Sequence, residues 1–75
     1  MKKMKKNSLS IKISSMRKES KMTQMQLSAK TGISRSHIAK IETNRIHNLS
    51  AETIYKISSV LPITTDEIIQ LIREN

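Results

Sequence analysis

The stretch TQMQLSAKTGISRSHIAKIE, residues 23–42, decides the fold of this 75-residue chain. Two hydroxyl residues in it, Thr23 and Ser34, stand where the first N–H groups of a helix need an acceptor, so each is interpreted as an N-cap. Between them lies Gly32, a residue that commonly ends a helix in the left-handed conformation. The stretch therefore predicts two short helices, one on each side of a tight turn.

The same helix-start pattern occurs four times along the chain. In each case an apolar residue precedes the hydroxyl residue and a second follows it by four positions, which is the hydrophobic staple of a helix entrance. The four sets are Met22-Thr23-Leu27, Ile33-Ser34-Ile38, Leu49-Ser50-Ile54 and Ile63-Thr64-Ile68. An earlier helix follows from Leu9, Ile13 and Met16, spaced by four and three. We expect five helices, over residues 9–19, 24–31, 35–43, 51–61 and 65–74.

Three residues predict where helices end. Gly32 allows a left-handed C-cap after the second helix, and Asn44, the next most tolerant residue, allows one after the third. Pro62 prevents the fourth helix from continuing. A single glycine and a single proline also argue against many tight hairpins. The predicted fold class is all-α, with short helices around one small core.

Composition excludes several kinds of function. The chain has no cysteine, so it has no disulfide, thiolate zinc site or thiol nucleophile. Its one aromatic residue, Tyr55, excludes folds that stack bases on several rings. His37 and His47 lack metal-ligand spacing and clustered carboxylates, so we predict no metal site. No serine, histidine and acid grouping stands out. We expect no enzyme, cofactor or small-molecule substrate.

Charge is distributed unevenly along the chain. Residues 1–48 hold 12 Lys and Arg against two acidic residues, a net +10, whereas residues 49–75 have a net charge of −2. A basic half predicts a polyanionic partner. Residues 1–8 are interpreted as a basic, disordered tail and residues 9–75 as the folded domain. No apolar run follows the tail, so we expect no export signal, no membrane association and a cytoplasmic location.

The connection between the second and third helices is typical of a helix-turn-helix, because it is short and has its glycine in the middle. Ser28 and Ala29 are small enough to let the second helix approach the third. Ile38 and Ile41 are expected to hold the third helix from beneath. The outer part of that helix would then present Arg35, Ser36, His37, Ala39 and Lys40.

The chain resembles the Cro/cI-like (XRE-type) helix-turn-helix repressors over about residues 9–72. The residues that carry the resemblance are Met22-Thr23-Gln24, Leu27, Gly32-Ile33-Ser34, Ile38, Ile41-Glu42 and the segment from Asn48 to Thr53. The resemblance implies a five-helix, lambda-repressor-like domain, usually a dimer. It also implies that the third helix binds in the major groove of double-stranded DNA.

Site roles follow from the same resemblance. The positions that reach base edges are Arg35, Ser36 and Lys40. Those that match phosphate contacts are Gln24, Arg45 and Asn48. His37 is added to the phosphate contacts because we expect it at the DNA surface. Arg17 and Glu42 match an internal salt bridge between the first helix and the third. Arg35 is the strongest candidate for sequence reading on physical grounds as well, because its guanidinium can bind guanine O6 and N7 together.

The sequence departs from the family pattern mainly at turns. Lys21 and Asn44 stand where the family commonly has glycine, so those turns are expected to be strained or differently shaped. Pro62 replaces another common glycine and is expected to tilt the last helix.

We expect a phage or bacterial repressor that acts as a dimer on a palindromic operator. The last helix carries Ile69 and Ile72, which we interpret as the dimer interface, since exposed apolar surface on a small domain often marks a partner site. Two other interpretations remain open. One is an antitoxin or antirepressor-type interaction module whose main, regulatory partner is a protein. The other is a non-specific RNA or DNA binder that acts through charge alone.

Overall fold

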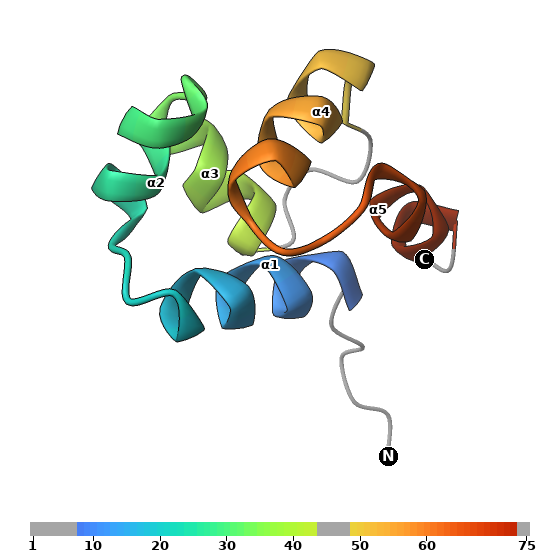
Figure 1. Cartoon of the computed structure of the whole chain (residues 1–75), viewed down its shortest axis with the longest axis horizontal. Coiled ribbons are helices and arrows are strands. Elements are labelled where there is room, and N and C mark those ends of the chain that lie inside the picture. Colours follow the sequence, from blue (N-terminus) through green and yellow to red (C-terminus); the bar gives the residue numbers. More distant parts are fainter. Residues whose placement is uncertain (1–7, 44–48, 74–75) are drawn as a thin grey trace.

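The computed structural model describes residues 8–43 and 49–73, and these residues form five helices (Figure 1). The helices are α1 (Ser8–Glu19), α2 (Gln24–Thr31), α3 (Arg35–Glu42), α4 (Ala51–Val60) and α5 (Thr65–Arg73). Each lies within one residue of its predicted range. The described residues contain no strand, which confirms the predicted all-α fold.

All four predicted N-caps are present. The hydroxyl of each cap residue accepts a hydrogen bond from the main-chain N–H three positions later, at 3.0–3.1 Å; the pairs are Thr23 with Gln26, Ser34 with His37, Ser50 with Thr53, and Thr64 with Glu67. The Gln26 and Glu67 side chains accept in return from the main-chain N–H of their cap residues, both at 2.9 Å. Two complete capping boxes therefore begin α2 and α5.

Two of the three predicted helix ends lie among the described residues, and both have the predicted chemistry. Gly32 follows α2 with φ of 81° and ψ of 5°, in the left-handed region. Leu61 ends α4 with ψ of 153°, the extended conformation that a residue before proline adopts, and so α4 stops at Val60. The third predicted stop, at Asn44, lies outside the described residues. Between α1 and α2, Lys21 has φ of 59°, which is unusual for a residue with a side chain.

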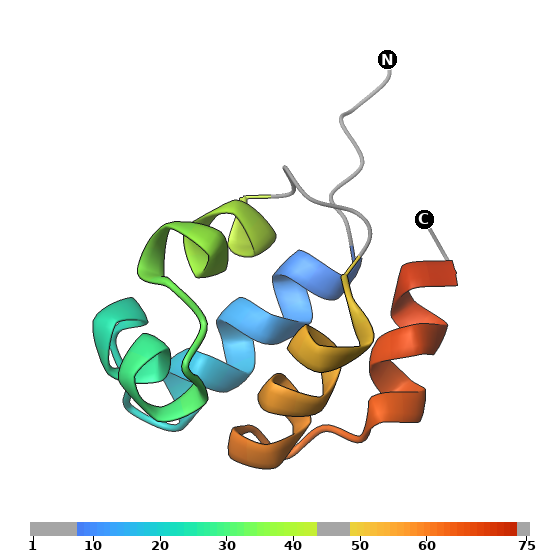
Figure 2. The same ribbon diagram turned by 90° about the horizontal axis from the view of Figure 1, so that it is seen from above.

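The helices enclose one apolar core. Figure 1 shows α1 running beneath the other helices, and it contacts both α3 and α5. In turn, α2 contacts α3 and α4, and α4 contacts α5. The buried apolar residues come from all five helices and the turns between them: Leu9, Ile13, Leu27, Ile33, Ile38, Ile41, Ile54, Ile57, Leu61, Ile63 and Ile68. Seen from above in Figure 2, α3 lies at an edge of the bundle, on the side away from α5. Its main helix contacts are with α1 and α2.

The predicted tail lies almost entirely outside the described residues, which begin at Ser8. That residue opens α1, one position before the predicted domain boundary. None of the helices in the described ranges is both long and apolar enough to span a membrane.

Candidate nucleic-acid interface

The turn between α2 and α3 is held by hydrogen bonds, of which the two made by the Thr31 hydroxyl are buried. The N–H of Gly32 donates to the carbonyl of Ser28 at 2.8 Å and closes the last turn of α2. The buried hydroxyl of Thr31 donates to the carbonyl of Leu27 at 2.8 Å and accepts from the N–H of Ile33 at 3.1 Å. These bonds fix the path of the chain through the turn, and they fix the direction in which α3 leaves it.

The outer face of α3 is cationic and exposed. Ile38 and Ile41 are 2% and 1% exposed, so one side of the helix is anchored in the core. The three predicted base-reading residues, Arg35, Ser36 and Lys40, are all exposed. This helix-turn-helix geometry can place two cations and a hydroxyl into a groove about 12 Å wide, the width of the DNA major groove.

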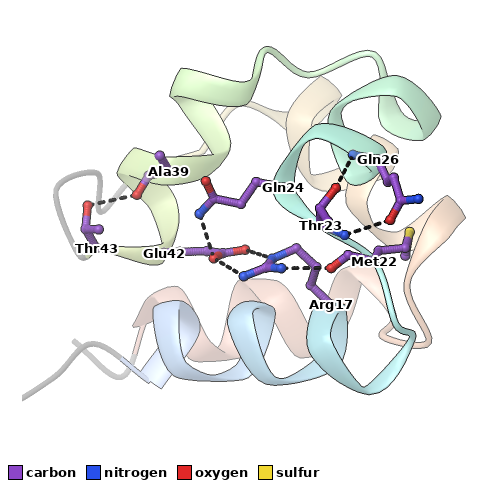
Figure 3. A network of polar contacts seen from close by, with 8 residues as sticks. All are labelled: Arg17, Met22, Thr23, Gln24, Gln26, Ala39, Glu42 and Thr43. Atoms are coloured by element: carbon purple, nitrogen blue, oxygen red, sulfur yellow. Dashed lines mark hydrogen bonds and ion pairs between the residues drawn. The ribbon is translucent and has the colours of Figure 1, made fainter.

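A polar network lies at the C-terminal end of α3, around Glu42 (Figure 3). Arg17 on α1 and Glu42 on α3 form a bidentate pair, with Nε donating to Oε2 at 2.7 Å and Nη2 donating to Oε1 at 3.0 Å. Nη1 of Arg17 donates to the carbonyl of Met22 at 2.8 Å. The pair predicted from the sequence is therefore in direct contact, and it joins α1 to both the α1–α2 connection and α3.

The surroundings of Arg17 favour its charged form. The hydrogen bond to Glu42 raises the pKa of the Arg17 guanidinium, and the negative charge of Glu42 acts in the same direction; desolvation opposes both. The side chains are 11% and 5% exposed. Such a shielded, bidentate pair is held more firmly than an ion pair on the open surface.

Gln24, the predicted phosphate ligand, is half-buried and belongs to the same network. Its Nε2 donates to Oε1 of Glu42 at 3.1 Å. Sequence reasoning placed Gln24 at a phosphate and Arg17 with Glu42, but it did not predict that the amide and the carboxylate meet. They are 18 positions apart, so only the packing of α2 on α3 reveals the contact.

The remaining predicted site residues are spread over the molecule. His37 is half-buried on α3, and its main-chain N–H is used by the Ser34 cap. Arg45 and Asn48, like His47, lie outside the described residues. On α5, Ile69 is 40% exposed, whereas Ile72 is half-buried and packs against the core. Within residues 8–43 and 49–73, no three His, Asp or Glu side chains gather as a metal site.

Comparison with known proteins agrees with this geometry. A family model described as helix-turn-helix matches residues 13–68. The immunity repressor protein of Bacillus phage phi105 is 40% identical over 58 residues, which is 77% of this chain and 40% of that protein. The chain thus spans less than half the length of this relative. Because the family match covers the capped α2–α3 unit and most of the core around it, the chain belongs to the XRE-type (Cro/cI-like) helix-turn-helix family.

Proposed function

We propose that this protein is a sequence-specific regulator of transcription, a repressor that binds double-stranded DNA through α3. One observation carries the proposal: Arg35, Ser36 and Lys40 are exposed on a helix whose opposite side is anchored by Ile38 and Ile41. The similar phage protein is named an immunity repressor, which supports the same role.

The proposed contacts divide into two kinds. Base edges are read by Arg35, Ser36 and Lys40, with Arg35 bidentate on a guanine. Backbone phosphates are bound by Gln24, His37, Arg45 and Asn48, which orient the domain without reading sequence. The net charge of +10 on residues 1–48 adds affinity that does not depend on sequence and that falls as salt rises. This repressor would act in the cytoplasm.

The proposed active form is a homodimer. Ile69 offers exposed apolar surface on α5, and the half-buried Ile72 lies three positions later in the same helix. The net charge of −2 on residues 49–75 limits repulsion between two basic protomers at this surface. Two-fold symmetry would place the two α3 helices in successive major grooves about 34 Å apart, on a roughly palindromic operator.

Selection of bound duplexes from a random pool, followed by sequencing, tests the proposal. We expect enrichment of a single motif with two inverted half-sites about one helical turn apart. A pool that shows no enrichment, together with a steep salt dependence of binding, would instead identify a non-specific binder.

A further inference from the structure

Glu42 lies where the fold-stabilising contacts meet the proposed DNA-binding contacts. It is the last residue of α3, and its side chain is only 5% exposed. Three donors converge on its carboxylate: Nε and Nη2 of Arg17, and Nε2 of Gln24. Oε1 alone accepts from both partners, at 3.0 Å from Arg17 and 3.1 Å from Gln24. The ion pair and the amide are therefore fixed through the same oxygen.

A carboxylate in this place selects the orientation of the Gln24 amide. An ionised carboxylate only accepts hydrogen bonds, whereas the two ends of a glutamine amide are a donor and an acceptor of nearly equal size. The nitrogen end of Gln24 must therefore face Glu42. That nitrogen carries two N–H groups, of which one suffices for the bond to Glu42. The second keeps a fixed direction because the first is held.

The pairing with Arg17 explains how an acidic residue can serve a DNA-binding face. A lone carboxylate beside a phosphate backbone would repel it, and a buried lone carboxylate would be costly. The bidentate guanidinium of Arg17 neutralises Glu42 and keeps it rigid. Glu42 can then hold Gln24 without adding a net negative charge at the interface.

We infer that Glu42 is a positioning residue for DNA binding: it holds Nε2 of Gln24 so that the second N–H of this amide meets a backbone phosphate. The inference rests on the proposed function. Through this bond the phosphate contact of Gln24, the first residue of α2, is linked to Glu42, the last residue of α3. The position of α3 in the groove is therefore fixed relative to the phosphate that Gln24 binds. Glu42 thus has a role in DNA binding in addition to its role in packing α1 against α3.

A double-mutant cycle on the full chain tests this role. Binding to the selected duplex is measured for the wild type, Gln24→Ala, Glu42→Gln and the double variant. We expect each single change to weaken binding about tenfold, the scale of one hydrogen bond to a charged group. In the Glu42→Gln background, Gln24→Ala should weaken binding by less than about twofold, because the amide has already lost its fixed direction.

Two matched controls separate this effect from charge and from the loss of an amide. Glu52→Gln raises the net charge by the same amount as Glu42→Gln, but Glu52 is an exposed residue whose partner is Lys56 on α4. Gln70→Ala removes an exposed amide from α5. Neither should weaken binding as much as twofold. Fully multiplicative effects of Gln24→Ala and Glu42→Gln would overturn the inference.

Gln24→Asn tests the same role without disturbing the ion pair. The asparagine amide is one methylene shorter, so it cannot make the contact that Gln24 makes with Glu42 at 3.1 Å. We expect it to bind the duplex as weakly as Gln24→Ala does, while the chain stays folded because the Arg17–Glu42 pair is kept. Binding close to that of the wild type would overturn the inference.

Side-chain amide resonances of Gln24 supply a readout that does not use DNA. In the free protein they should shift in Glu42→Gln and stay in place in Glu52→Gln; no shift in Glu42→Gln would also overturn the inference. Failure of the proposed function would look different. A wild-type chain that does not bind the selected duplex overturns both the proposed function and the positioning role of Glu42. Tight binding by the wild type, with independent effects of Gln24→Ala and Glu42→Gln, overturns only the positioning role.

Discussion

The hydroxyl of Thr31 accepts a hydrogen bond of 3.1 Å from the main-chain N–H of Ile33, inside the turn that joins α2 to α3. The same hydroxyl donates to the carbonyl of Leu27 at 2.8 Å. One side chain, 7% exposed, thereby satisfies a donor and an acceptor of the main chain in a place that water scarcely reaches. The helix-turn-helix depends on this hydroxyl as well as on its glycine.

Thr31→Val removes both hydrogen bonds while it keeps the shape of the side chain. We expect the free energy of unfolding to fall by about 1–2 kcal/mol, because the N–H of Ile33 is left buried without its acceptor. Chemical denaturation measures the change. Thr43→Val is the matched control, since the exposed Thr43 hydroxyl makes a similar bond of 2.8 Å to the carbonyl of Ala39. Equal losses in the two variants would contradict the role given to Thr31.

A second stability prediction concerns Lys21, the non-glycine residue with positive φ among those described. The left-handed conformation costs an ordinary residue about 1–2 kcal/mol, whereas glycine adopts it freely but loses about 0.5–1 kcal/mol in chain entropy. Lys21→Gly should therefore raise the free energy of unfolding by about 0.5–1 kcal/mol. Denaturant titration tests the sign. Lys18→Gly, inside α1, removes the same charge and should be destabilising.

The contrast between Lys21 and the four N-caps shows what the sequence could reveal. A cap is local: Ser34 and the N–H of His37 lie three positions apart, so spacing alone predicts the bond. The departure at Lys21 was visible as a residue in place of the family's usual glycine. Its φ of 59° confirms that a left-handed residue is needed there, with the strain that a side chain brings.

The candidate site was predictable only in part. Ile38 and Ile41 fix which side of α3 faces the core, so the exposure of Arg35 and Lys40 follows from helical periodicity. The bond between Gln24 and Glu42 did not follow, because it depends on how closely α2 packs on α3. The two hydrogen bonds of the Thr31 hydroxyl cannot be predicted from spacing either, because a hydroxyl in a turn can bond to water as readily as to the main chain.

Sequence reading by Arg35 has a direct test. Arg35→Ala should cost about 1–3 kcal/mol of binding free energy at the selected duplex and relax the preference at one base pair in each half-site. Binding measured across single base substitutions gives both quantities. Lys30→Ala, a loss of one exposed cation from α2, should leave base preference intact. Unchanged base preference in Arg35→Ala would remove its proposed role.

Dimerisation through α5 gives the last prediction. Ile69→Asp places a charge where the proposed dimer buries an apolar side chain, and 40% exposure lets the single chain stay folded. Sedimentation should show a dimer for the wild type and a monomer for Ile69→Asp, with operator binding weakened because each half-site is then bound alone. Tyr55→Asp, at an exposed apolar residue of α4, should remain dimeric. A wild-type chain that is monomeric even when bound to its operator contradicts the dimer and favours α5 as a surface for a different protein.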